Sequence, residues 1–237
     1  MVPHGPTHTL SRRLALSAVH RGVAYEERSM ALLQARLSMS LRRIGGRADG
    51  GVDLQGWWWL PSDDDPATLS GVPGHRRLRV LAQCKAESKK MGPKYIREME
   101  GVLHRYHAMG PFEEPGTQES RSVDPAVGLM ISSSSFSKAA ALLAHSSPLP
   151  LILMYIPEYD PLDENAPQVA CEDPEEQQIP GFVTFNPALA AKGGLLRGEF
   201  EVRWEYQAHA PAEGRLGLWW KGKRVESWTP DVDQEDL

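Results

Sequence analysis

The chain has 237 residues, 41% of them hydrophobic, and a formal net charge of −5. This composition predicts a globular core, and the longest apolar run, residues 149–156, is far shorter than the ~20 residues of a membrane-spanning helix. The two cysteines, Cys84 and Cys171, exclude a disulfide framework or a cysteine-rich zinc site and favour a reducing compartment.

The charges are distributed unevenly along the chain. Residues 1–110 contain 17 Lys and Arg against 10 Asp and Glu, a balance of +7, whereas residues 111–237 contain 9 against 21, a balance of −12. Because polyanions bind basic surfaces, a nucleic acid would contact the first half of the chain and avoid the second.

The first predicted elements are a leader and a helix. Residues 1–25 are rich in Ser, Thr and Arg and contain no acidic residue, which is typical of a mitochondrial presequence, so we expect a leader over residues 1–20. Residues 23–41 predict a helix, and Glu26 lies on its apolar stripe. An ionised carboxylate there costs free energy unless it is paired or binds a metal. The alternative is a carboxylate that only interacts favourably with the helix dipole.

A glycine-rich turn around Asp49 and a β-hairpin follow. Residues 54–60 and 78–84 predict two antiparallel strands, joined by a loop that contains Asp63, Asp64 and Asp65. If the loop closes between Leu60 and Leu78, Asp53 lies opposite Lys85 and Gln55 opposite Gln83. Gln83 and Lys85 then share one face of the sheet with the Asp53 carboxylate.

The remaining chain predicts an α/β core and a β extension. We expect helices over 94–109 and 136–145, the second capped by Ser134 or Ser135, and strands over 127–132 and 151–156. The predicted domains are a core over 21–157, an acidic loop over 158–180, an extension with a hairpin over 181–230 and an acidic tail over 231–237. The hairpin strands are residues 199–207 and 215–228.

Two groups of tryptophans allow two interpretations. Those of the extension, Trp219, Trp220 and Trp228, either stack on nucleobases or cover a core. Trp57, Trp58 and Trp59 alternate faces of a strand, so we expect at least one of them to be exposed or near the site.

The motifs together resemble a known superfamily. They are Tyr25-Glu26 on a helix, Gly-Arg-Ala-Asp-Gly-Gly-Val-Asp at 46–53, Gln-Cys-Lys at 83–85, Glu-x-Glu-Gly at 98–101, and the strand, Ser-rich turn and helix of 127–144. Residues 20–157 are thus similar to the Mrr branch of the PD-(D/E)xK restriction-endonuclease-like superfamily. Within it, they resemble a fungal mitochondrial family called required for respiratory growth protein seven.

This resemblance implies the fold, the reaction and the site. It implies a mixed sheet flanked by helices and a nuclease that hydrolyses phosphodiester bonds with Mg²⁺ or Mn²⁺, acting on DNA ahead of RNA in the mitochondrial matrix. Asp53, the Cys84 carbonyl and Glu26 would hold the metal, and Lys85 would orient the attacking water. Gln83 would either ligate the metal or hydrogen-bond this water. Most of the superfamily has an acid at the position of Gln83, although glutamine is usual in the Mrr branch.

The basic residues around this site predict phosphate contacts. They are Arg42, Arg43 and Arg47 before it and Lys89, Lys90 and Lys94 after it, together with Ser135 and Lys138 at the start of the later helix. A homodimer would suit duplex cleavage. Two other functions remain open: a nucleic-acid-binding protein that does not cleave, and a factor for mitochondrial gene expression that binds a protein partner.

Overall fold

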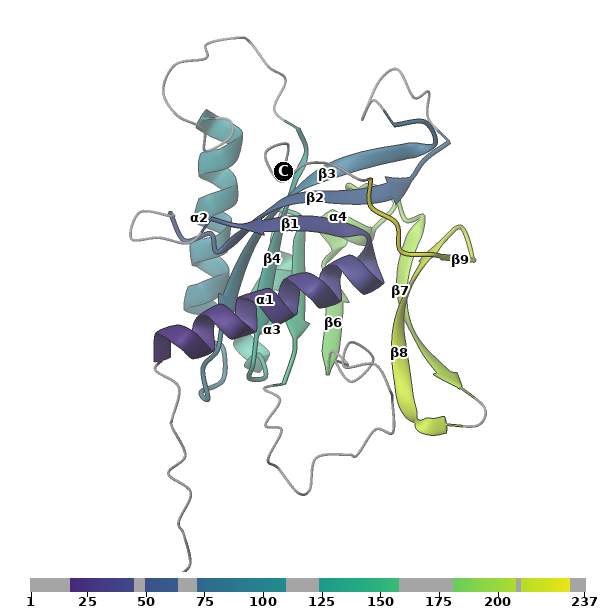
Figure 1. Cartoon of the computed structure of the whole chain (residues 1–237). Coiled ribbons are helices and arrows are strands. Elements are labelled where there is room, and N and C mark those ends of the chain that lie inside the picture. The colour runs from purple at the N-terminus through teal and green to yellow at the C-terminus, as the bar shows by residue number, and fades with distance from the viewer. Residues whose placement is uncertain are drawn as a thin grey trace, which may run out of the picture.

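The computed structural model describes residues 18–44, 50–63, 72–109, 124–157, 181–207 and 210–230. They form a six-stranded mixed sheet with helices on both faces and a separate three-stranded sheet (Figure 1). This confirms the predicted mixed α/β class with a C-terminal β extension. No helix in these ranges is long and apolar enough to cross a bilayer.

The elements have these bounds in chain order: α1 (Ala18–Leu37), β1 (Met39–Arg43), β2 (Leu54–Pro61), β3 (His75–Lys85), α2 (Pro93–Met109), β4 (Ala126–Ser132), α3 (Lys138–Ser146), β5 (Leu151–Tyr155), β6 (Phe182–Phe185), α4 (Pro187–Ala190), β7 (Phe200–Gln207), β8 (Ala210–Trp220) and β9 (Lys223–Val225).

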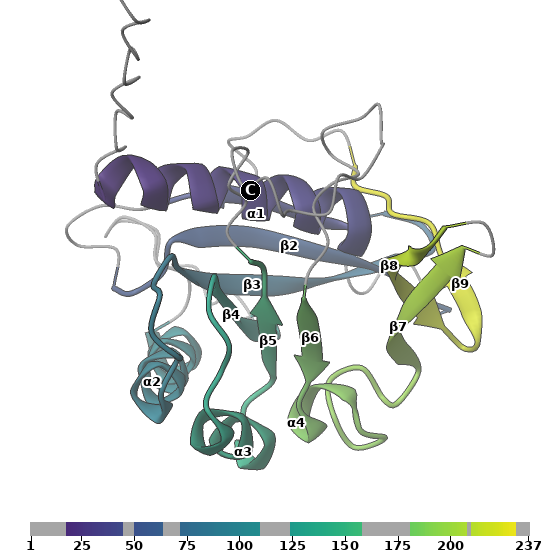
Figure 2. The same cartoon turned by 90° about the horizontal axis from the view of Figure 1, so that it is seen from below.

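The large sheet has the order β1-β2-β3-β4-β5-β6. β1, β2 and β3 are antiparallel, β3, β4 and β5 are parallel, and β6 pairs antiparallel with β5. Figure 2 shows α1 on one face of this sheet and α2 and α3 on the other. Because both faces are covered, β4 is buried along its whole length and reads as a continuous apolar run.

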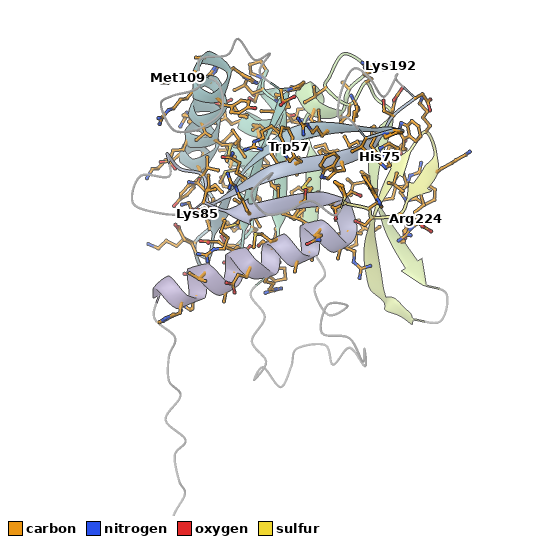
Figure 3. All side chains as sticks on the ribbon, turned by 45° about the horizontal axis from the view of Figure 1, so that its top comes forward. Trp57, His75, Lys85, Met109, Lys192 and Arg224 are labelled. Carbon is orange, nitrogen blue, oxygen red and sulfur yellow. The ribbon has the colours of Figure 1, made fainter. Side chains whose placement is uncertain are left out.

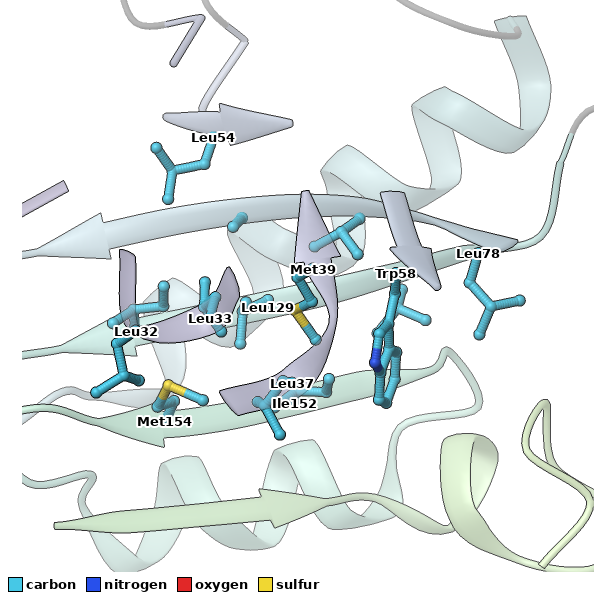
Figure 4. Close-up of a cluster of buried hydrophobic side chains, with 14 of the residues drawn as sticks. Leu32, Leu33, Leu37, Met39, Leu54, Trp58, Leu78, Leu129, Ile152 and Met154 are labelled. Carbon is cyan, nitrogen blue, oxygen red and sulfur yellow. The ribbon is translucent and has the colours of Figure 1, made fainter. Parts of the chain in front are cut away.

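Each face of the sheet has its own core. On the α1 face, Leu33, Leu37 and Trp58 pack with residues of β3, β4 and β5 (Figure 4), and the cluster continues into the small sheet through Phe200 and Leu218. On the other face, α2 buries Ile96, Met99, Leu103 and Tyr106, as its periodicity predicts.

The predicted helix over 23–41 is wrong at its C-terminal end. α1 ends at Leu37, and β1 begins at Met39. Ser38 between them has φ +58°, its N–H donates to Ser227 Oγ (3.0 Å), and its Oγ accepts from Trp228 N–H (3.1 Å). The helix is therefore ended by contacts with the far end of the chain, which local periodicity does not reveal.

The hairpin forms, but its predicted register is wrong by two residues. Leu60 lies opposite Arg76, and Gln55 lies opposite Leu81. β3 begins at His75, so the loop is shorter than expected, and the second strand slides along the first. A shift of two residues keeps every side chain on its predicted face.

Two further predictions are corrected by the structure. The α3 cap is Ser137, whose Oγ accepts from Ala140 N–H (3.2 Å), and neither Ser134 nor Ser135. The three tryptophans of β2 are all buried, although at least one was expected to be exposed or near the site: Trp57 is 8% exposed, Trp58 0% and Trp59 3%. Trp58 lies in the core on the α1 face. On the other face, Arg77 and Arg79 cover Trp57, and Trp228 covers Trp59.

Of the acidic hairpin loop and the acidic segment 158–180, only the ends of the loop belong to the described residues. Asp63 is exposed and pairs with Lys221 Nζ at 2.7 Å. Asp64, Asp65 and Cys171 lie outside the described residues, as do residues 1–17 of the predicted leader and the segment 158–180, whereas residues 18–20 belong to α1.

Candidate functional site

The predicted site forms where β2 begins and β3 ends. Asp53 stands just before β2, its N–H donates to Ala82 O (2.9 Å), and its Oδ2 accepts from Cys84 N–H (2.7 Å). These bonds fix the carboxylate against the strand that carries Gln83 and Lys85. Because the N–H and C=O of one strand residue point to the same edge, the Cys84 carbonyl also faces Asp53.

Gln83 lies under the glycine turn on the α2 face of the sheet. It is 6% exposed, and its Oε1 is buried with no hydrogen-bond partner among the described residues. Gly51, with φ +87°, lies next to it, and an added Cβ would be in ordinary contact with Gln83 Nε2, at 3.6 Å. A buried oxygen without a donor is costly, and it is an available ligand for a hard cation.

The environment of Cys84 reflects charged candidates from both faces of the sheet. The pKa of its thiol is raised well above the usual value, first by burial and then by the negative charges of Asp53 and Glu26, while Lys85 acts in the opposite direction. Asp53, Glu26 and Lys85 are therefore all close to this residue. Glu26 approaches from α1, whereas the alternation of β3 directs Gln83 and Lys85 to the other face.

Glu26 is paired in the structure. Its Oε2 accepts from Arg43 Nε at 2.7 Å, and Arg43 Nη1 lies 3.8 Å from Glu27 Oε1. The sequence predicts a phosphate contact for Arg43 and metal binding for Glu26, and both stay predictions. In the structure the two side chains pair with each other, and pairing is one of the two ways in which a carboxylate on an apolar stripe offsets its cost.

The other basic candidates lie mainly around the turn after β3. Lys89 and Lys90 are exposed there, and this segment is joined to the turn before α3 by Ser134 Oγ donating to Lys89 O (2.6 Å) and Met91 N–H donating to Ser135 O (3.0 Å). Lys94 at the start of α2 is exposed and lies 3.6 Å from Glu98. Lys138 and Ser135 are exposed, Arg42 is half-buried beside Gln55, and Arg47 lies outside the described residues.

These groups fit a Mg²⁺ or Mn²⁺ ion by their chemistry. No cluster of three or more His, Cys, Asp and Glu that could hold a metal is found among the described residues. The fit depends instead on oxygens of three kinds: the Asp53 carboxylate, the orphaned Gln83 amide and the Cys84 carbonyl. Carboxylate and carbonyl oxygens are the ligands that these ions prefer.

The structure adds one residue to the site and gives another an unpredicted contact. Gly51 lies over Gln83, and Arg43, which the sequence predicts only as a phosphate contact, pairs with Glu26. Gly51 carries a usable signal, because it belongs to the glycine turn beside Asp53. The Arg43 contact carries none, because residues 39–41 were assigned to the end of a helix rather than to β1.

Comparison with known proteins gives one family. A family model described as Required for respiratory growth protein 7 matches residues 17–179. The protein of that name from Zygosaccharomyces rouxii is 28% identical over 65% of this chain and 71% of its own length. Those from Vanderwaltozyma polyspora and Saccharomyces cerevisiae are 26% and 31% identical, over 62% and 38% of this chain. No solved structure matches the chain.

The relatives carry two further facts. They are named as mitochondrial proteins, which confirms the predicted mitochondrial localisation. The chain covers 66% of the Vanderwaltozyma protein and 50% of the Saccharomyces protein, so it spans only part of these relatives.

Proposed function

The chain belongs to the required for respiratory growth protein 7 family, and from this we propose that it is a metal-dependent nuclease of the mitochondrial matrix that hydrolyses phosphodiester bonds, with DNA as the first substrate class to test. We also propose that its large sheet is a restriction-endonuclease-like core of the Mrr type. The observation that supports this best is the buried, unpartnered Gln83 Oε1 beside the fixed Asp53 carboxylate.

Each residue of the site has a separate role in this proposal. Asp53, Gln83 Oε1 and the Cys84 carbonyl hold the ion, and a bound Mg²⁺ or Mn²⁺ supplies Lewis acidity and lowers the pKa of a water. Lys85 orients that water by hydrogen bonding and offsets negative charge that develops on the phosphorus centre. Lys89 and Lys90, exposed at the end of β3, bind the flanking phosphates.

In this proposal, Arg43 can exchange its partner from Glu26 to a phosphate of the substrate. While it pairs with Glu26, the carboxylate is unavailable to a metal. A phosphate that attracts the Arg43 guanidinium would release Glu26, so substrate binding and completion of the metal site are coupled in this proposal.

The test is cleavage of labelled nucleic acids by the full chain. Supercoiled plasmid, linear duplex, single-stranded DNA and RNA are incubated with Mg²⁺ or Mn²⁺ and with EDTA as control. We expect metal-dependent nicking that falls at least ~100-fold in Asp53→Asn and Lys85→Ala, because each removes a group that acts on the reacting phosphate. Lys223→Ala, an exposed lysine on β9, is the matched control and should cleave normally.

Two results would refute the nuclease: no metal-dependent cleavage of any substrate, or unchanged cleavage in a folded Asp53→Asn variant. Thermal unfolding of each variant shows whether a loss of activity reflects a loss of structure.

The charge of the site favours a second candidate, a nucleic-acid-binding protein that does not cleave. Arg43 neutralises Glu26, and Gln83 is uncharged, so the site attracts a divalent cation less than one with two free carboxylates. This candidate predicts duplex binding that is equally tight in wild type and Asp53→Asn, with intact substrate at saturating Mn²⁺. A factor for mitochondrial gene expression would instead retain a protein partner after nuclease treatment.

A further inference from the structure

A cavity of about 480 Å³ lies at the opposite end of β3 from the candidate site. β3 begins at His75, but β4 joins it only at Arg79, so among the described residues no strand pairs with the first part of β3 on that side. α4 and the turn over 193–197 stand opposite this uncovered stretch, while Pro125 and Pro150 close the cavity from the starts of β4 and β5.

Three arginines line this cavity: Arg76, Arg77 and Arg197. Arg76 and Arg77 are strand neighbours and point to opposite faces, yet both border the cavity because it lies at the edge of the strand. Asp124 is the one acidic residue among the described residues of its wall. Positive charge therefore dominates a concave, partly enclosed space.

Two of these arginines are held in place by other contacts. Arg76 is 8% exposed, and its Nη1 donates to Leu195 O at 3.2 Å. The Arg77 guanidinium stacks on Trp57, with its Cζ 4.0 Å from the ring centroid. A ligand that binds them has little side-chain freedom to remove, so the cavity is pre-organised.

The backbone adds a further donor. Arg79 N–H donates to Pro125 O (2.9 Å), and residues two apart in a strand direct their N–H groups to the same edge. Arg77 N–H therefore points to the uncovered edge and into the cavity. Arg197 adopts φ +56°, a conformation that glycine and asparagine favour. An arginine at this position is therefore not explained by the backbone conformation of the turn.

We propose that this cavity binds a small ligand with two or more phosphate groups, of the nucleoside diphosphate or triphosphate class. One guanidinium group can donate two parallel hydrogen bonds to the oxygens of one phosphate, so several arginines can bind several phosphates. The volume lies in the range of small-molecule sites. The apolar part of the wall, formed by Leu78, Pro125, Pro150, Ala188 and Leu195, accepts the rest of the ligand.

This site is independent of the proposed nuclease site. Arg77 and Lys85 are eight residues apart on one strand, or about 26 Å. In Figure 3, Lys85 and His75 lie at opposite ends of the hairpin, with Trp57 between them. The proposal therefore survives if the chain cleaves nothing.

The test is calorimetric titration of the full chain at physiological ionic strength without divalent cations. The probes are ATP, ADP, pyrophosphate, AMP and adenosine. We expect one saturable site for ATP, ADP and pyrophosphate, at least tenfold weaker binding of AMP and none of adenosine. Arg77→Gln and Arg197→Glu should each weaken ATP binding at least tenfold, whereas Arg97→Glu, an exposed arginine on α2, should leave it unchanged.

Several outcomes would overturn the proposal. They are no saturable binding of ATP, ADP or pyrophosphate, equal weakening by Arg97→Glu, or unchanged binding in folded Arg197→Glu. Loss of binding in Lys85→Ala instead would place the ligand at the candidate nuclease site. If Arg197→Glu weakens duplex DNA binding and leaves ATP binding intact, the cavity belongs to a nucleic-acid surface. Because Arg197 is exposed, its variant carries the test even if Arg77→Gln does not fold.

Discussion

Gln83 is a residue at which stability and the proposed function oppose each other. Its side chain is 6% exposed, and its buried Oε1 accepts no hydrogen bond from the described residues. An apolar side chain of the same length would fit the space beside Gly51 without leaving a polar atom unpaired. A glutamine retained at such a position is explained if the oxygen binds an ion.

The first prediction is that Gln83→Met stabilises the metal-free protein. We expect the free energy of unfolding to rise by about 1 kcal/mol, because the unpaired oxygen is removed and the volume is kept. Mg²⁺ or Mn²⁺ should then no longer raise the unfolding temperature, as it does when a bound ion stabilises the native state. Chemical denaturation with EDTA measures the first effect, and thermal unfolding with and without the metal measures the second.

A matched control and a contrary result complete this test. Gln34→Met, at an exposed position of α1, should change neither quantity. If Gln83→Met destabilises the metal-free protein and keeps a metal-dependent shift, Gln83 is a structural residue and the proposed ligand set is wrong.

At the scale of elements, the side chain of Asn186 connects three segments of the chain. Its buried side chain caps α4 by accepting from Leu189 N–H (3.1 Å) and also accepts from Leu151 N–H at the start of β5 (2.9 Å). Its amide donates to the carbonyls of Ala144 (3.0 Å) in the last turn of α3 and of Leu149 (2.8 Å) after this helix. One side chain thus fixes the positions of α3, β5 and α4.

The second prediction concerns this junction. Asn186→Ala should lower the free energy of unfolding by about 3 kcal/mol, because several buried backbone groups lose their partner at once. Asn186→Asp should be worse at pH 7 than at pH 4, since an ionised carboxylate cannot donate to the surrounding carbonyls. Ser146→Ala, which removes one exposed side-chain bond, is the control. Equal stability of Asn186→Ala and the control would contradict the assignment.

The elements also show how far the sequence predicts this fold. Local alternation predicts β2 and β3, and a register error of two residues still places Gln83 and Lys85 on the correct face. Local patterns do not predict β1, because Ser38 ends α1 through contacts with Ser227 and Trp228, almost the whole chain away. Since Arg43 lies on β1, its pairing with Glu26 was equally out of reach.

At the scale of the whole molecule, the small sheet and the large sheet share one core. Phe200, Leu216 and Leu218 belong to the same buried cluster as Leu37 of α1. After β9 the chain returns to the main body, where the Ser227 hydroxyl donates to Gln34 O (2.6 Å). The C-terminal extension is therefore expected to unfold together with the core, in a single transition.

Trp228 is the residue that tests this unity. Its ring stacks on His75 with centroids 4.2 Å apart and meets the edge of Trp59 at 6.2 Å, so it covers the loop end of the hairpin. It is 39% exposed, and the backbone N–H of the same residue donates to Ser38 Oγ. Removing the ring should weaken both the hairpin end and the α1–β1 junction.

The last prediction is that Trp228→Ala lowers the stability of the entire chain. We expect a loss of about 2 kcal/mol, less than for a fully buried tryptophan because part of the ring is in water. Far-ultraviolet circular dichroism and tryptophan fluorescence should still report the same midpoint. Trp219→Ala is the control, because Trp219 contacts Arg203 and Glu205 within the small sheet. If Trp228→Ala separates the midpoints of the two probes, the extension folds as an independent unit and the shared core does not couple it to the sheet that carries the candidate site.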